Sequence, residues 1–318
     1  MSRFEGNLGT HLLLLLVAVI WGTTWAVARF LSYGLDESTG ANLGPATAAW
    51  LRYLVVVIAF VAWCWAYKNR NGPRMLPHDS RSWRYTVWLG LLGTMAYQLL
   101  FMHGMKWTAA GDASLIIPVN PVFTVLLAAP MLGQKVTKRM AFGLLLGIVG
   151  VSVVVGWSPN TDIPFEHRLL GDAMIVLAAL AWATNSNLTK IALEEDGIGT
   201  TEELVIWYSI VGWIMLTPWM LAEIWGSGIP NPNTAEWGSI VYLGLFSTVL
   251  TYVWFARGID RIGPTAAASY VFLVPIFGVL SGWALLDESI GASMLVGFVL
   301  IVMAVREVQR ESERLRAD

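Results

Sequence analysis

Two stretches of this chain set polar side chains among apolar ones at matching spacing. Residues 20–30 read IWGTTWAVARF and residues 181–191 read AWATNSNLTKI, each with a cation eight residues after a Trp. An indole ring offers a solute an apolar face and one N–H donor. Thr, Asn and Ser both donate and accept hydrogen bonds. These residue types favour the binding of a small amphipathic solute.

The composition is that of an integral membrane protein. Of the 318 residues, 56% are hydrophobic and 13% are charged, and the mean hydropathy is +0.60, whereas soluble proteins are about 25% charged. No clear cleavage site follows the first apolar run, so we interpret that run as a retained membrane span. Cys64 is the one cysteine, which excludes an internal disulfide and implies no metal or redox cofactor.

Ten apolar runs are candidates for membrane-spanning helices, because a bilayer core of about 30 Å needs about 20 helical residues. We therefore expect an all-α integral membrane protein with ten transmembrane helices. The expected spans are 11–33, 45–66, 84–105, 110–131, 139–156, 170–191, 202–222, 237–256, 264–285 and 290–306.

The distribution of cations orients these spans. If the N-terminus is cytoplasmic, 16 of the 20 Lys and Arg residues fall on the cytoplasmic side, and only Lys106 and Arg168 lie in outside loops. Arg29 and Arg52 lie within spans or near their ends. Because cationic loops are retained in the cytoplasm, we predict a multi-pass protein of the plasma (inner) membrane with both termini cytoplasmic.

The two halves of the sequence repeat each other. Because each unit contains five spans, an odd number, the second unit enters the membrane from the opposite side. Such inverted repeats place a solute site near the midplane between the halves. We expect one unit at 1–157, another at 168–307 and a charged cytoplasmic tail at 308–318. The matched pairs are Gly90 and Gly244, Thr94 and Thr248, and Pro121 and Pro275 at an offset of 154, and Trp21 and Trp182, Thr24 and Asn185, and Arg29 and Lys190 at an offset of 161.

Six short motifs follow one another along the chain. They are WGTTWAVAR, LRY around Arg52, PVNPV, GDAMIVLAALAWA, FLVPIFGVLSGWALLDE and GFVLIVMAV. In this order they resemble EamA-type proteins of the drug/metabolite transporter superfamily, over nearly the whole chain. The resemblance implies ten helices, cytoplasmic termini, and export or facilitated passage of amino acids or similar metabolites. One departure is that the common Gly-Glu ending of the fourth helix becomes Gly133-Gln134 in the first half, against Asp287-Glu288 in the second.

Polar and aromatic side chains within the spans are candidates for a substrate site, because polar groups are costly inside a membrane. The alternative is that they form hydrogen bonds between helices, as small polar residues do in membrane bundles, and we assign Asn187 to that role. The candidate substrate-binding residues are Trp21, Thr24, Trp25, Tyr97, Gln98, Asn120, Trp182, Asn185, Ser186, Thr251, Tyr252 and Tyr270.

Three prolines are candidates for gating. Pro118, Pro121 and Pro275 fall within predicted spans. A proline inside a helix frees a carbonyl and permits a kink, which can serve as a hinge or be a static bend.

Two titratable or charged residues are candidates for coupling. His103 can move protons or simply face the lipid headgroups. Arg52 can bind a substrate carboxylate or brace a helix against backbone carbonyls, and we favour bracing. We expect Arg29 and Lys190 to extend from helix ends to the membrane surface.

These features favour a secondary transporter, an exporter or facilitator of amino acids or related amphipathic solutes. A nucleotide-sugar or sugar-phosphate exchanger is the alternative, and it would need several cations at the site. A membrane enzyme or a non-transporting protein is more remote, because the four histidines are scattered. No GxxxxGK phosphate loop is present, so we expect the flux to need no ATP. We find no Asp or Glu in the middle of a span, which favours facilitated diffusion or exchange. The expected partners are a small-molecule substrate and the bilayer, with no nucleic acid and no cofactor, and a homodimer is left open.

Overall fold

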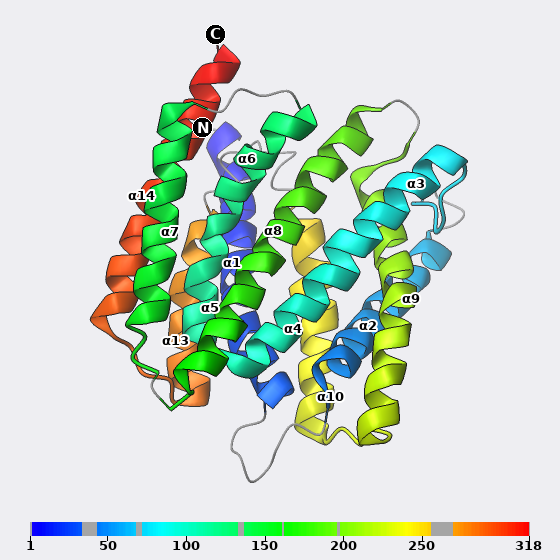
Figure 1. Ribbon diagram of the computed structural model, residues 1–318. Helices are drawn as coiled ribbons and strands as arrows, with labels where there is room; N and C mark the ends of the chain where they lie inside the picture. The colour runs from blue at the N-terminus through cyan, green and yellow to red at the C-terminus, as the bar shows by residue number, and fades with distance from the viewer. Residues whose placement is uncertain are drawn as a thin grey trace.

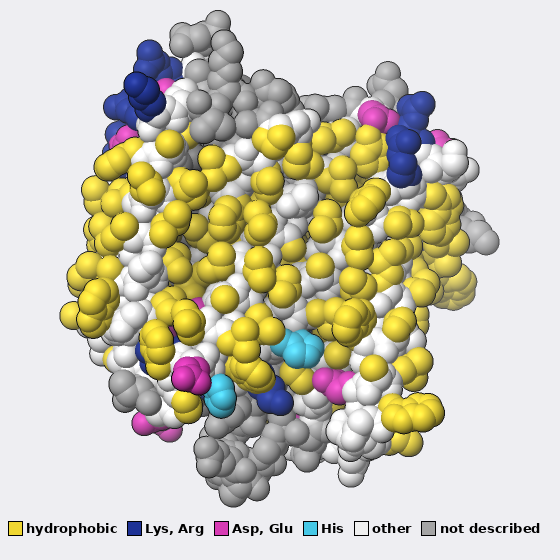
Figure 2. Space-filling model, viewed as in Figure 1, with side chains coloured by type: hydrophobic (Ala, Val, Ile, Leu, Met, Phe, Trp, Pro, Cys, Tyr) yellow, Lys and Arg dark blue, Asp and Glu magenta, His cyan; other side chains and the backbone are white. Residues whose placement is uncertain are grey.

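The protein is a bundle of helices, as the computed structural model in Figure 1 shows. The structure describes residues 2–33, 43–67, 72–132, 137–160, 162–195, 198–255 and 270–317. Within these ranges every regular element is helical, and seven helical segments are long and apolar enough to cross a membrane. In Figure 2 a broad band of hydrophobic side chains lies between charged groups at the two ends of the bundle. The predicted all-α membrane class is confirmed.

Each half of the chain supplies a comparable series of elements. The first half contains α1 (Ser2–Tyr33), α2 (Pro45–Ala66), α3 (Ser80–Leu89), η1 (Gly90–Ala96), α4 (Tyr97–Trp107), α5 (Ala110–Ile116), η2 (Ile117–Val119), α6 (Asn120–Leu132) and α7 (Lys138–Gly156). The second half contains α8 (Phe165–Glu194), α9 (Thr201–Ser227), α10 (Thr234–Val241), η3 (Tyr242–Leu250), a helical continuation at 251–255, η4 (Tyr270–Leu273), α13 (Val274–Leu286) and α14 (Ala292–Ala317).

Three of the ten expected spans differ from the seven long segments. The turn η2 divides the span expected at 110–131 into α5 and α6. Of the span expected at 264–285, residues 264–269 lie outside the described part of the chain, and α13 is 13 residues long. The described apolar part of α14 covers Ala292–Ala304, and the same helix continues to Ala317 through the charged tail.

Irregular helical turns recur at the offset of 154 residues. Both η1 and η3 are π-helical, and both η2 and η4 are 3₁₀-helical. Helices α6 and α13 begin at residues 120 and 274 and end at 132 and 286. Pro121 and Pro275 each occupy the second position of these helices, where a missing N–H breaks no intrahelical bond. The repeat read from the sequence therefore extends to local backbone geometry.

Helices α7 and α14 pack closely through small residues. Gly150 lies against Gly297 and Ile301, and Gly147 lies against Ala304. A Cβ added at Gly150 would lie 3.1 Å from the carbonyl oxygen of Gly297. Such residues allow helix backbones to approach each other in a membrane. Because residue numbers rise along α7 as they fall along α14, these two related helices run antiparallel.

Helices α2 and α9 form a second antiparallel pair. Trp50 Nε1 donates to Thr217 Oγ1 (3.0 Å) in the first two turns of α2. At one end, the Glu223 carboxylate accepts from Thr47 N and Thr47 Oγ1, each at 2.6 Å. Glu223 thus satisfies a free N–H in the first turn of α2 and ties it to α9.

Candidate functional site

Seven aromatic rings form a continuous series through the interior, which we call the aromatic chain. Its members come from α1, α4, α8 and the helix at 251–255, so both halves contribute. Five of the seven were predicted from the sequence, whereas Phe101 and Phe255 were not. In order, with ring-centroid distances, the chain runs Phe255, Trp21 (5.2 Å), Tyr252 (6.3 Å), Trp182 (5.9 Å), Tyr97 (5.1 Å), Phe101 (5.9 Å) and Trp25 (5.2 Å).

Helical periodicity explains one of these ring pairs, because Tyr97 and Phe101 are four residues apart on α4 and share a helix face. Trp21 and Trp25 are likewise four residues apart on α1, and their rings contact different members of the chain. The rings of Tyr97 and Phe101 are stacked, with an interplanar angle of 5°. The chain offers a flat apolar or aromatic group several π faces, and an ammonium group several cation–π partners.

Hydrogen bonds fasten α1 to η3 and the helix that follows it. Trp21 Nε1 donates to Thr251 Oγ1 (2.9 Å). Thr24 and Ser247 share a hydrogen bond of 2.6 Å between their hydroxyl oxygens. Trp21, Thr24 and Thr251 were predicted as site residues, and here they join the two halves.

Arg52 is the buried cation of this region, with 4% of its surface exposed. Its Nε and Nη2 donate to Thr248 Oγ1 (3.3 and 2.9 Å), and its Nη1 donates to Gln98 Oε1 (3.2 Å). We expected backbone carbonyls as partners, but the acceptors are neutral side chains from η3 and α4. No salt bridge to Arg52 is found among the residues that the structure describes.

Asn185 occupies in the second half the place that Thr24 holds in the first. It is 4% exposed, and its Oδ1 has no hydrogen-bond partner in the described part of the chain. It lies against Gly93, where an added Cβ would come within 2.4 Å of Oδ1. Gly93 corresponds to Ser247 at the offset of 154. The contact between Asn185 and Gly93 is therefore equivalent to the contact between Thr24 and Ser247.

Three other candidates make their hydrogen bonds to groups other than the rings of the aromatic chain. Asn120 Nδ2 donates to the carbonyl of Ala179 (2.8 Å) and so ties α6 to α8. Ser186 Oγ donates to the Trp182 carbonyl of its own helix (2.9 Å). The hydroxyl of Tyr270 pairs with Nδ1 of His11 at 2.6 Å, joining η4 to α1. Asn187 donates to the carbonyl of Thr124 (2.9 Å), the interhelical role that we expected.

The three prolines lie where a 3₁₀ turn meets an α-helix. Pro118 lies within the turn η2, and Pro121 and Pro275 are the second residues of α6 and α13. The backbone stays right-handed helical from α5 through η2 into α6, and the role of these prolines in gating stays a prediction. His103 is half-buried, and its Nδ1 lies 2.8 Å from the carbonyl oxygen of Leu99 on the same helix.

The predicted position of Arg29 is wrong, because this residue is buried at 7% exposure. Its Nη1 donates to the carbonyls of Met105 (2.8 Å) and Lys106 (2.5 Å) at the end of α4. Terminal carbonyls of a helix lack intrahelical partners, so the guanidinium satisfies them. Lys190 is exposed, as expected.

A second buried polar cluster, which the sequence interpretation placed merely near helix ends, lies at the starts of α5 and α8. Asp112 and Asp172 are 0% and 1% exposed. Ser158 Oγ donates to Asp112 (2.5 Å) and Thr108 Oγ1 donates to Asp172 (2.5 Å). Both aspartates follow a glycine and precede an alanine, a repeated Gly-Asp-Ala signal that could have identified them. We call these four residues the aspartate cluster.

Glu288 caps α5 from the loop after α13. Asp287 ends α13 in the left-handed conformation (φ 54°), which Asp tolerates better than most residues. The Glu288 carboxylate accepts hydrogen bonds from Ala110 N (2.6 Å) and Gly111 N (2.8 Å). Burial raises the pKa of Glu288 above its ordinary value. The corresponding residue of the first half, Gln134, lies outside the described residues.

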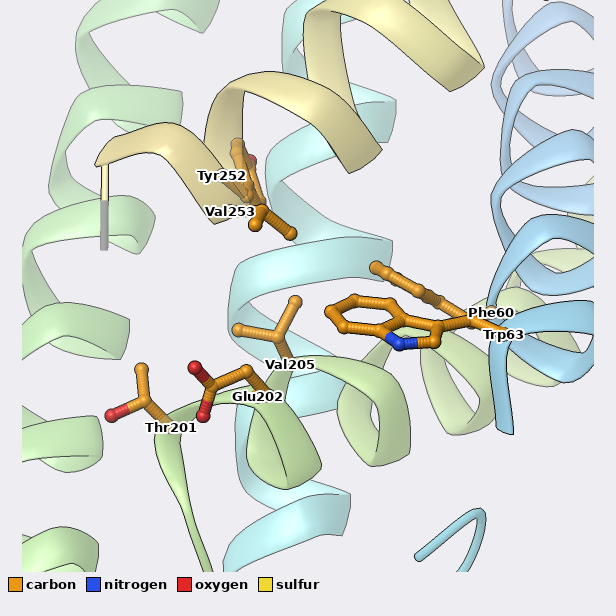
Figure 3. Close-up of a pocket in the computed structure, with 7 residues that line it drawn as sticks. All are labelled: Phe60, Trp63, Thr201, Glu202, Val205, Tyr252 and Val253. Carbon is orange, nitrogen blue, oxygen red and sulfur yellow. The ribbon is translucent and has the colours of Figure 1, made fainter. Parts of the chain in front are cut away.

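One pocket adjoins the aromatic chain (Figure 3). Its volume of about 20 Å³ holds little more than one water molecule, so this pocket is smaller than a solute of amino-acid size. Tyr252 lines both the pocket and the chain. The other lining residues are Phe60 and Trp63 of α2, Thr201, Glu202 and Val205 of α9, and Val253.

Comparison with known proteins decides the family. The model of the EamA-like transporter family matches residues 8–156 and again 169–306. The chain belongs to the EamA-like transporter family. It is therefore a multi-pass membrane transporter, in agreement with the apolar helices.

Individual relatives share the chain's full length at low identity. A Bacillus subtilis (strain 168) protein named uncharacterized transporter YyaM is 24% identical over 301 residues, covering 94% of this chain and 93% of the relative. An Escherichia coli (strain K12) protein named probable amino-acid metabolite efflux pump is 27% identical over 310 residues, covering 95% and 93%. A solved crystal structure with 19% identity matches at a TM-score of 0.60, covering 95% of this chain and 97% of that one, and supports the fold alone.

Proposed function

We propose that this protein is a secondary transporter that exports small amphipathic metabolites, amino acids above all, across the plasma membrane by alternating access. The observation that carries the proposal is the aromatic chain, in which Trp21 and Tyr97 from the first half meet Trp182 and Tyr252 from the second. A solute held there contacts both halves, so relative movement of the halves changes the side from which it is reached.

The proposed architecture is ten membrane-spanning helices in two inverted repeats, residues 1–157 and 168–307. The two family matches, the shared offset of 154 and the antiparallel pairing of α7 with α14 support it. Both termini lie at the same end of the bundle in Figure 1, and the Lys and Arg distribution favours the cytoplasm for that end.

The chemistry of the site favours zwitterions over phosphorylated solutes. Exchange of sugar phosphates would call for several cations at the aromatic chain. Arg29 is instead held by helix-end carbonyls and Lys190 is exposed, which leaves Arg52 as the cation beside the chain in the described region. The efflux-pump name of a relative 27% identical to this chain also supports an amino-acid substrate.

The two ends of the bundle carry different features. The pocket lies between the end of α2 and the start of α9, a region that the cation distribution assigns to the cytoplasm. The aspartate cluster lies where that distribution predicts the outside, and its carboxylates accept hydrogen bonds from neighbouring hydroxyls.

Flux through proteoliposomes tests the proposal. Purified protein receives a mixed pool of amino acids, and the lumen is read by mass spectrometry with and without a pH gradient. We expect saturable flux without ATP that falls at least tenfold in Trp182→Ala and is unchanged in Trp225→Ala, a matched control whose side chain is 93% exposed. Absence of flux for every amino acid would refute the substrate class, and strong dependence on the gradient would make His103 the first coupling residue to test.

A further inference from the structure

We infer that Arg52 receives a single carboxylate of the transported solute while the aromatic chain holds its apolar body. This inference rests on the proposed function and specifies the substrate class further. The solute is a monocarboxylate with an apolar or aromatic side chain, such as a neutral amino acid, and not a dianion.

The charge on Arg52 supports this role. Its guanidinium is buried at 4% exposure, and its hydrogen bonds go to the neutral oxygens of Thr248 and Gln98. A cation inside a membrane protein is normally paired, because an uncompensated buried charge is costly. The described part of the chain supplies no carboxylate to it. A guanidinium has five N–H donors in a planar fork that matches a carboxylate, so a solute carboxylate compensates the charge.

The position of Arg52 brings this charge next to the aromatic chain. Gln98 adjoins Tyr97 on α4, and Thr248 precedes Tyr252 by four residues, one helical turn. Thr248 and Tyr252 therefore share a helix face, and Gln98 comes from the same turn of α4 as Tyr97. In our proposal, the carboxylate of a solute that stacks on Tyr252 reaches toward Arg52.

The second half holds no matching cation, which limits the anion to one charge. Gly244 packs against the backbone of Arg52, and its counterpart Gly90 packs against the backbone of Tyr208. Arg52 and Tyr208 are therefore equivalent positions. With Tyr208 at the second position, the site offers one guanidinium, enough for one carboxylate but not for a phosphate dianion.

A pair of solutes that differ only in the carboxylate tests the inference. Proteoliposomes receive L-phenylalanine or L-leucine, each alongside its carboxamide, which keeps the side chain and the ammonium group. We expect the wild type to transport the acids at least about tenfold better than the amides, the worth of one charge-assisted hydrogen bond. Arg52→Gln is expected to remove that preference by slowing the acids and not the amides, and Arg52→Lys to restore it in part.

Tyr208→Phe is the matched control at the equivalent position, and we expect it to keep the wild-type ratio of acid to amide. If the wild type carries acids and amides equally, or if Arg52→Gln slows both alike, Arg52 is a structural brace and the inference is overturned while the transporter proposal stands. If the wild type carries none of these solutes nor any other amino acid, the proposed function itself fails. Should Arg52→Gln not fold, the wild-type ratio alone still decides.

Discussion

In the first half, α2 places Arg52 beside Thr248 of η3, and in the second half α9 places Tyr208 beside Thr94 of η1. The guanidinium donates to the Thr248 hydroxyl (2.9 Å), whereas the Thr94 hydroxyl donates to the Tyr208 carbonyl (3.4 Å). Both threonines lie in π-helical turns that are 154 residues apart. The two halves thus have the same backbone geometry here, whereas the side chain at this position is charged in the first half (Arg52) and neutral in the second (Tyr208).

The contacts of α1 and α8 differ in the same way. Thr24 meets Ser247 through a hydrogen bond, whereas the larger Asn185 meets Gly93 by contact alone. A large side chain faces a glycine in one half, and two small side chains face each other in the other half, so the total volume is similar. Close-packed interiors accept such exchanges of volume. The comparison teaches that the two halves share backbone geometry but place different polar side chains at equivalent positions.

The largest expected effect comes from placing a cation in the second half at the position equivalent to Arg52. Tyr208→Arg would bury a guanidinium where no carboxylate is found among the described neighbours of Tyr208, at a cost of about 3 kcal/mol or more. We expect a sharp loss of folded protein on size-exclusion chromatography and a lower Tm in detergent. Tyr208→Phe is the control and should melt within a few degrees of the wild type. A fully stable Tyr208→Arg would mean that the halves tolerate equal charge.

Exchanging the small residues between halves tests whether the two contacts are equivalent. Gly93→Ser places a Cβ against Asn185, and overpacking of this kind costs about 1–3 kcal/mol. The double variant Gly93→Ser with Asn185→Thr rebuilds the Thr24–Ser247 pair of the other half and should recover most of the loss in Tm. If the double variant is less stable than Gly93→Ser alone, the two positions are not interchangeable.

The two related tryptophans should differ in what their N–H contributes. Trp21→Phe loses the hydrogen bond to Thr251 and is expected to cost about 0.5–1.5 kcal/mol. Trp182 contacts Tyr97 and Tyr252 through its ring, so Trp182→Phe keeps much of that contact and should cost less. Thermal melts of both variants, with Trp21→Phe/Thr251→Val as a double-mutant cycle, check the difference. Equal losses of Tm in Trp21→Phe and Trp182→Phe would mean that Trp21 stabilises the protein through its ring and not through its N–H.

The smallest expected effect concerns Glu288, whose counterpart in the first half is Gln134. Burial raises the pKa of Glu288 from the ordinary 4.5. As the pH rises between the pKa of the unfolded chain and the higher pKa of the folded protein, the unfolded chain loses this proton first. The folded protein then binds more protons, and stability falls as pH rises. Glu288→Gln has no proton to lose.

A series of melts between about pH 4 and 8 checks this sign. The difference in Tm between wild type and Glu288→Gln should shift against the wild type as pH rises. A difference that moves in the favour of the wild type would show that the hydrogen bonds from Ala110 and Gly111 outweigh burial.

The sequence alone predicted the helical class, the shared helix face of two site candidates and the offset between the halves. Apolar runs must form helices in a membrane, because no water is present to satisfy the backbone, so the helical class follows from composition. Spacing by four placed Trp21 with Trp25 on one face, and the structure has both in the aromatic chain. The offset of 154, read from glycines and prolines, reappears in the boundaries of α6 and α13.

Other features follow from no local pattern. The sequence shows the prolines but not that Pro121 and Pro275 begin helices after a 3₁₀ turn. It shows Asp112 and Asp172 near helix ends. It does not show that each is buried and accepts a hydrogen bond from a hydroxyl of another segment. It also led to Arg29 being placed at the membrane surface, because the carbonyls that receive it belong to α4, 76 and 77 residues away.

Sequence by itself therefore determined which residues share a helix face and which positions of the two halves correspond, since periodicity and repetition are properties of the chain. Only the tertiary structure decided what each polar group meets. On sequence grounds alone, Arg52 could either donate hydrogen bonds to backbone carbonyls or bind a substrate carboxylate. The approach of Thr248 and Gln98, with no carboxylate among the described neighbours, is a fact of three-dimensional packing, because hydrogen-bond partners in a helix bundle come from helices far apart in sequence.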